Sequence, residues 1–334
     1  MIKIVIYFFT VLLLNFLIKK LNFLPNFIGH KHQLFISKKN VPLTGGIFIL
    51  IIFFVLFFKN LYLLFFFTSI FLIGFCGDKN YLISPSKRLI LQIIIVLLFV
   101  HHFDLFIVSS RIETLDLILN NFYFKYIFSV FCILILINGS NFIDGLNGLL
   151  ISYFLIILFV IYKIGLIDLF NFSHDNLIFL FICLIFLLLL NYFSLFFLGD
   201  SGSYLIGLFI AYILIASFNY YQLVVTPYFI ILLLWYPCFE NLFSIIRKNK
   251  IGFSPIAPDN KHLHQLIYIY LKTKINIGKN YLNSLTSIFI NIFNILIIYS
   301  ASFQPNHTMY QIFHLIFAVA TYVILYLFLA KKLN

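Results

Sequence analysis

Charged residues are scarce in this chain. Only 10% of its 334 residues are Asp, Glu, Lys or Arg, and 63% are hydrophobic. A soluble domain is usually about 25% charged and about 45–50% apolar. The composition therefore excludes a water-soluble globular protein, and it excludes disordered, collagen-like and coiled-coil chains as well.

Cysteine is also rare, and its spacing does not suggest a metal or redox site. The four cysteines lie in or beside apolar segments and form no CxxC pair, which argues against a zinc site or a disulfide framework. Neither the phosphate-binding GxxxxGK[ST] sequence nor the HExxH pattern of zinc proteases occurs. These absences exclude P-loop ATPases and zinc proteases of that kind, and we expect the cysteines to be small buried apolar residues.

Long apolar segments make up most of the chain. A membrane-spanning helix needs about 20 apolar residues, and eleven runs approach that length. We therefore predict an all-α, polytopic integral membrane protein with 10–11 transmembrane helices and a single transmembrane domain over residues 1–334. The runs cover residues 2–18, 44–58, 61–76, 89–103, 126–143, 148–167, 177–198, 202–218, 224–246, 282–300 and 310–330.

The basic residues predict the orientation of these spans. Eleven spans place 17 of the 22 Lys and Arg residues on one side, and the positive-inside rule makes that side cytoplasmic. The N-terminus is then outside and the C-terminus is cytoplasmic. No small-residue cleavage site follows the first run, so we expect it to be a retained span. The five basic residues on the outer side are Lys3, Lys59, Arg111, Lys125 and Lys163.

Four polar clusters interrupt the apolar pattern, and all of them fall on the predicted cytoplasmic side. The first covers residues 74–88 and contains Gly77, Asp78 and Arg88. Asp78 can bind a cation or accept a proton, and the Arg88 guanidinium can bind phosphate oxygens through paired hydrogen bonds. Arg88 could equally be a charge that only sets topology.

The second cluster, residues 138–148, is the densest. It contains the candidate residues Asn138, Asn141, Asp144 and Asn147 among three glycines. The end of an ordinary helix needs a single Gly or Asn. Three asparagines and an aspartate therefore favour a functional site.

The third cluster, residues 198–203, lies between two apolar runs and reads Leu-Gly-Asp-Ser-Gly-Ser. Asp200 could cap the helix that follows. It could also bind a hard cation beside a phosphate at the helix N-terminus. The sequence leaves both interpretations open.

The fourth cluster is the polar loop 247–280. It contains Arg247 and the sequence Asp259-Asn260-Lys261-His262-Leu263-His264. Two histidines with neighbouring basic residues favour an anion-binding site. The alternative is a basic loop that sets topology and whose individual side chains do not matter.

Oxygen ligands and basic groups at one membrane face suit magnesium-assisted chemistry of phosphates. A secondary transporter or lipid flippase is the main alternative, and an inactive membrane scaffold is another. A transporter would have polar groups near the bilayer midplane and inverted repeats. The clusters lie at one face and no repeat is visible, so an enzyme is favoured.

In this order, the four clusters resemble those of the polyprenyl-phosphate N-acetylhexosamine-1-phosphate transferases. This is glycosyl transferase family 4, which contains WecA and MraY. The resemblance extends from Thr44-Gly45-Gly46 to His264 and depends on the motifs in combination. It implies transfer of a sugar 1-phosphate, expected to be N-acetylhexosamine 1-phosphate, from a UDP-sugar to undecaprenyl or another polyprenyl phosphate. UMP is released, either directly or through an aspartyl-phosphate intermediate.

The resemblance also implies residue roles. Asp78, Asp144 and Asp200 are the expected catalytic residues, and Asp200 with Asn141 would bind Mg²⁺ or Mn²⁺. The expected substrate and phosphate ligands are Arg88, Asn138, Asn147, Arg247, His262 and His264.

The chain departs from the family pattern at two positions. Gly77 stands where the family usually has an acid, and Asn147 replaces the second acid of a DGxDG sequence. The loop reads His-Leu-His-Gln rather than three consecutive histidines, which favours the branch that serves O-antigen, lipopolysaccharide or other surface glycans over the muramoyl-pentapeptide branch. We expect the partners to be the UDP-sugar, the polyprenyl phosphate, the lipid bilayer and a second copy in a homodimer, with no nucleic acid. The expected location is the bacterial inner membrane.

Overall fold

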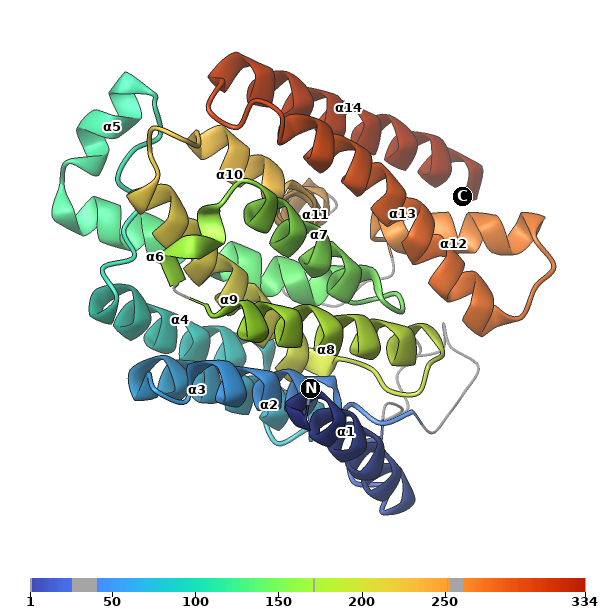
Figure 1. Ribbon diagram of the computed structural model, residues 1–334. Coiled ribbons are helices and arrows are strands. Elements are labelled where there is room, and N and C mark those ends of the chain that lie inside the picture. Colours follow the sequence, from blue (N-terminus) through green and yellow to red (C-terminus); the bar gives the residue numbers. More distant parts are fainter. Residues whose placement is uncertain (1, 26–40, 171, 251, 253–260, 334) are drawn as a thin grey trace.

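The computed structural model describes residues 2–25, 41–170, 172–250, 252 and 261–333, and the regular elements in these ranges are helices (Figure 1). The all-α prediction is thus confirmed for the described residues. In chain order the helices are α1 (Ile2–Lys20), α2 (Gly45–Phe57), α3 (Leu61–Asp78), α4 (Pro85–His102), α5 (Glu113–Leu119), α6 (Phe122–Ile143), α7 (Leu149–Lys163), the 3₁₀ helix η2 (Leu166–Phe170), α8 (His174–Tyr192), α9 (Gly199–Tyr220), α10 (Pro227–Leu233), α11 (Trp235–Lys250), α12 (Leu263–Lys274), α13 (Lys279–Ala301) and α14 (Thr308–Leu333).

Eight of the described helices are long and apolar enough to cross a membrane. The pair α10 and α11 would be a ninth span, bent by 77° at Leu234. The polytopic prediction is confirmed, but the predicted ten to eleven spans exceed this number. The difference lies in α2 and α7, which have 13 and 15 residues. At 1.5 Å per residue, helices of this length fall short of the roughly 30 Å hydrocarbon layer.

Helix α9 is the centre of the bundle. It packs against α2, α3 and α6, and 89% of its most apolar stretch is buried inside the protein. A helix that is apolar around its whole circumference is stable in such an enclosed position. The first turn of α9 carries Asp200, so the core of the fold fixes the position of that carboxylate.

Two glycines allow neighbouring helices to approach α9 closely. A Cβ atom on Gly74 of α3 would collide with the backbone of Ser201, and a Cβ on Gly207 would lie 2.8 Å from Ile137 Cα of α6. Small residues at such crossings are typical of membrane helices, where close van der Waals packing drives association. These contacts hold the ends of α3 and α6 beside the start of α9.

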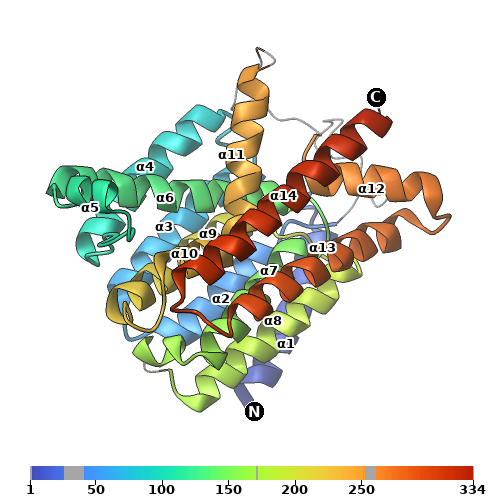
Figure 2. The ribbon, with the colours of Figure 1, turned by 90° about the horizontal axis from the view of Figure 1, so that it is seen from above.

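The outer helices present apolar side chains to the surroundings. Helix α1 buries only Tyr7 and Val11, and large exposed side chains such as Phe9, Phe16 and Phe317 cover the outside of α1 and α14. An apolar surface of this extent is not found on a soluble monomer, and it fits contact with lipid. Helix α11 projects from the bundle after the bend, packed against α6 and α14 (Figure 2).

Candidate active site

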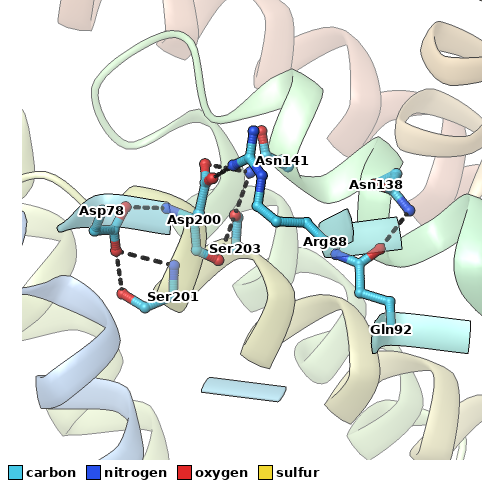
Figure 3. Close-up of polar contacts among 8 residues, drawn as sticks. All are labelled: Asp78, Arg88, Gln92, Asn138, Asn141, Asp200, Ser201 and Ser203. Carbon is cyan, nitrogen blue, oxygen red and sulfur yellow. Dashed lines mark hydrogen bonds and ion pairs between the residues drawn. The ribbon is translucent and has the colours of Figure 1, made fainter. Parts of the chain in front are cut away.

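Side chains from three of the four predicted clusters form one group of polar contacts (Figure 3). Arg88 in the first turn of α4 forms an ion pair with Oδ2 of Asp200, and Asn141 at the end of α6 donates a hydrogen bond of 2.7 Å to Oδ1 of Asp200. The Asn141 amide also lies 3.2 Å from the Ser203 hydroxyl. The Arg88 and Asp200 side chains are 23% and 24% exposed, so a ligand can reach both.

Asp78 lies beside this group but is bound to the backbone of α9. Its carboxylate accepts hydrogen bonds from the N–H of Asp200 (2.8 Å), the N–H of Ser201 (3.1 Å) and the Ser201 hydroxyl (2.6 Å). The side chain is therefore buried, with 7% exposed. Asp78 thus caps α9 from a neighbouring helix, and the Asp200 carboxylate is left to face Arg88 and Asn141.

Gly77 is in direct contact with the ion pair. A Cβ atom at this position would lie 2.9 Å from Asp200 Oδ2 and 3.1 Å from Arg88 Nη1. The missing side chain therefore leaves the space in which Arg88 and Asp200 approach each other. The departure from the family pattern at Gly77 lies at the centre of the site.

Asn138 has a partner that the sequence pattern does not predict. Its amide donates to Gln92 Oε1 at 3.1 Å and to the Leu134 carbonyl at 2.9 Å. Gln92 lies one turn after Arg88 on α4 and is fully buried. A single amide inside an apolar run is the signal that could have pointed to it.

Asp144 follows directly after α6. The residue is half-buried. Burial raises the pKa of the Asp144 carboxyl well above its usual range, and the nearby carboxylates of Asp200 and Asp78 raise it further. A carboxyl with a raised pKa keeps its proton to a higher pH than an ordinary one.

Asn147 lies apart from the Arg88–Asp200 pair. Its amide donates to the Ser194 hydroxyl at 2.8 Å, its backbone N–H donates to Asn283 Oδ1 at 2.7 Å, and its carbonyl accepts from the Ser287 hydroxyl at 2.6 Å. These contacts bind the 138–148 segment to α13 and to the turn after α8. In this structure Asn147 connects helices, and its predicted role in substrate binding stays a prediction.

The two histidines of the fourth cluster lie against the second cluster. His262 precedes α12, and His264 is the second residue of that helix. The His264 ring covers Gly145, where a Cβ would lie 2.5 Å from Nε2. Burial lowers the pKa of His264 to about 3, so this imidazole is neutral at pH 7 and offers one donor and one acceptor.

Arg247 lies in the last turn of α11, where Nη2 is 3.2 Å from the Ser244 hydroxyl. Residues 251 and 253–260, with Asp259, lie outside the described residues. The structure therefore brings together Asp78, Arg88, Asn141 and Asp200. It also places His264 against residues 138–148, the segment that contains Asn141.

The donor set fits a divalent cation of the magnesium type. Mg²⁺ is usually held by one or two carboxylates together with phosphate oxygens and water, and Asp200 with the carbonyl oxygen of Asn141 could supply the protein ligands. Among the described residues, no three His, Cys, Asp or Glu side chains cluster as a self-sufficient metal site. A cation held by Asp200 and Asn141 would therefore need further ligands, such as phosphate oxygens or water.

Comparison with known proteins supports the family suggested by the motifs. Residues 60–218 match the model of glycosyl transferase family 4, and this segment contains the first three clusters. The fourth cluster, with Arg247, His262 and His264, lies outside the matched segment.

The chain is similar to transferases of two kinds. It is 31% identical over 232 residues to a phospho-N-acetylmuramoyl-pentapeptide-transferase of Prochlorococcus marinus subsp. pastoris, covering 62% of this chain and 64% of that protein. It is 29% identical over 153 residues to a decaprenyl-phosphate N-acetylglucosaminephosphotransferase of Mycolicibacterium smegmatis, covering 39% and 37%. It is 28% identical over 157 residues to an undecaprenyl-phosphate alpha-N-acetylglucosaminyl 1-phosphate transferase of Escherichia coli K12, covering 43% and 41%. The chain thus spans less than two thirds of each of these relatives.

Proposed function

We propose that this chain transfers a sugar 1-phosphate from a UDP-sugar to a polyprenyl phosphate at the cytoplasmic face of a membrane. An oxygen of the lipid phosphate attacks the β-phosphorus of the UDP-sugar. The bond between the β-phosphorus and the oxygen that bridges it to the α-phosphorus breaks, and UMP leaves with that oxygen. The product is a lipid-linked diphosphate sugar.

The observation that carries this proposal is the convergence of Arg88, Asn141 and Asp200 from three helices at one end of an apolar bundle. Two anionic substrates repel each other, so the site must present fixed positive and hydrogen-bonding groups where negative charge develops. Arg88 is such a group, and its exposure allows it to exchange part of its contact with Asp200 for a phosphate oxygen. The names of the similar transferases, which mention polyprenyl phosphates, support the same reaction.

Each residue has a distinct task in this proposal. Arg88 holds phosphate oxygens, Asn141 orients the Asp200 carboxylate, and Asp78 holds the start of α9 in place. His264, which is neutral, would act as a hydrogen-bond donor at the segment 138–148. A bound Mg²⁺ on Asp200 and Asn141 would neutralise phosphate charge.

The polar groups at one end of the bundle do not favour a transporter. A secondary transporter places its substrate site near the bilayer midplane, whereas Asp78 ends α3 and Asp200 begins α9. These positions at helix ends support chemistry at a membrane surface.

The test is to incubate the purified protein with undecaprenyl phosphate, Mg²⁺ and a panel of UDP-sugars, and to measure UMP release. The panel should include UDP-N-acetylglucosamine, UDP-N-acetylgalactosamine and UDP-N-acetylmuramoyl-pentapeptide. We expect UMP only when both the lipid phosphate and one donor are present. No UMP with any donor, from protein shown to be folded, would contradict the proposal.

The UDP-sugar that supports UMP release also tests to which branch of the family the chain is related. The His-Leu-His-Gln sequence favours an N-acetylhexosamine donor and a surface-glycan product, although similar proteins of both branches match the chain. Release of UMP with the muramoyl-pentapeptide donor alone would assign the chain to the other branch.

A further inference from the structure

A buried carboxylate lies next to the histidines of the fourth cluster and has no assigned role. Glu240 is on α11, and only 1% of it is exposed. Burying an ionised carboxylate costs several kcal/mol unless charged or hydrogen-bonding groups compensate. A glutamate is therefore expected in this position only with a specific partner.

Its partner at 2.9 Å is His262, and Tyr322 also faces the carboxylate. Oε1 of Glu240 lies 2.9 Å from Nδ1 of His262, and both side chains are enclosed in protein. An ionised carboxylate can only accept hydrogen bonds, so Nδ1 must carry the proton. The contact therefore selects one tautomer of His262, and together with the capping box formed with Gln265 it holds the orientation of the ring.

The ring of His262 in turn supports His264. The two imidazoles are stacked, with centroids 5.6 Å apart and planes 10° apart, and Phe142 lies 5.2 Å from His262. Both ring nitrogens of His264 lack a hydrogen-bond partner within the described part of the chain, although the residue is fully buried. Such unmet capacity beside Gly145 is expected where a ligand supplies the missing partner.

We propose that Glu240 is a positioning residue, which fixes the tautomer and ring orientation of His262 and thereby holds His264 in place over Gly145. Its effect on turnover rests on the proposed function, whereas the contact between Glu240 and His262 does not. Helix α11, which starts after the 77° bend, brings Glu240 to the histidines. The direction that α11 takes after the bend therefore places Glu240 beside the candidate active site.

The first measurement is the tautomer of His262. Protein labelled with ¹⁵N-histidine is reconstituted in nanodiscs, and the His262 signals are assigned from their loss in His262→Gln. We expect a protonated Nδ1 in the wild type and a mixture of tautomers in Glu240→Gln, where the neutral amide can accept or donate. A wild-type His262 with an unprotonated Nδ1 would overturn the proposal, even if the variant did not fold.

The second measurement is UMP release. Glu240→Gln should lower kcat by about tenfold or more, as when a group that orients a functional histidine is removed, with a smaller effect on KM. Glu240→Asp keeps the charge and should recover part of the rate. Glu113→Gln is the matched control, since Glu113 is an exposed acid on α5. Unchanged turnover in Glu240→Gln would overturn the positioning role.

The two measurements separate this proposal from the proposed function. If the wild type releases no UMP with any donor, the function fails, and the tautomer of His262 still decides whether Glu240 positions it. If UMP is released but Glu240→Gln has wild-type kcat and an unchanged tautomer, the function stands and the positioning role fails.

Discussion

Asp200 is the residue on which most contacts of the candidate site converge. Its two carboxylate oxygens separately contact Arg88 and Asn141. Asp200→Asn removes the charge that attracts Arg88 and that a cation would need, so we expect UMP release to fall by about 100-fold or more. The assay compares it with Asp168→Asn, a change at an exposed acid in η2. Near-normal activity of Asp200→Asn at saturating Mg²⁺ would contradict this role.

Gly77 gives a second prediction at the level of single residues. A carboxylate at this position would lie beside Asp200 and would compete with it for Arg88. We therefore expect Gly77→Asp to reduce UMP release, although it restores the acid that the family usually has. Gly77→Ala separates crowding by a Cβ atom from the effect of charge. A large increase in rate for Gly77→Asp would mean that this chain is an impaired relative.

His264 predicts how stability depends on pH. The pKa of this side chain is about 3 in the folded protein, and it is about 6.5 in an unfolded chain. The unfolded state therefore binds more protons below pH 6.5, and stability is lost as the pH falls from there toward 3. His264→Gln should show a smaller fall in melting temperature between pH 7 and pH 5 than the wild type. Equal falls in both proteins would contradict a buried, neutral His264.

At the scale of helices, Asp78 joins the end of α3 to the start of α9. Asp78→Ala leaves three donors of α9 without their acceptor, and loss of a helix cap usually costs about 0.5–2 kcal/mol. We expect a lower melting temperature and the loss of nearly all UMP release, because the first turn of α9 also carries Asp200. Ser201→Ala removes only the 2.6 Å contact and should have a smaller effect on both. A stable Asp78→Ala protein with full activity would argue against the capping role.

The sequence predicts most helices because a bilayer requires long apolar runs, and each predicted run overlaps a helix or the bent pair. It does not predict α5 and α12, which are short and carry polar residues, so neither forms an apolar run. The bend between α10 and α11 is also missed, since Pro237 is the only local signal and lies in the first turn of α11, where proline is tolerated.

For the candidate site, alternating spans predict that Arg88, Asn141 and Asp200 share one side. The contacts of Arg88 and Asn141 with Asp200 depend on how α4, α6 and α9 pack. The pattern of apolar runs in the sequence does not predict this packing. The contacts of Asn147 show most clearly what the sequence does not predict, because its partners lie on α13 and at Ser194. The buried partners Gln92 and Glu240 lie within helices, and a sequence alone does not show which neighbours they face.

The predicted orientation is tested at the scale of the whole molecule. Arg111, assigned to the outer side, lies 3.0 Å from the Gln222 carbonyl and 3.1 Å from the Thr308 hydroxyl, so these three loops share one end of the bundle. We expect reporter fusions after Asn334 and within residues 247–280 to report the cytoplasm, and a fusion within 302–307 to report the outside. An external signal from either of the first two would overturn the topology and the cytoplasmic site.

The enclosure of α9 affects how the protein is made. Residues 199–220 leave the ribosome after α2, α3 and α6, so those helices enter the membrane before the helix that fills the space between them. Until then Asp78 lacks the hydrogen-bond donors of α9 that it binds in the finished bundle. Gly74 likewise lacks the Ser201 backbone against which it packs. Nascent chains that end before residue 199 should therefore be targets of membrane quality-control proteases, whereas chains that extend past residue 220 can close the bundle.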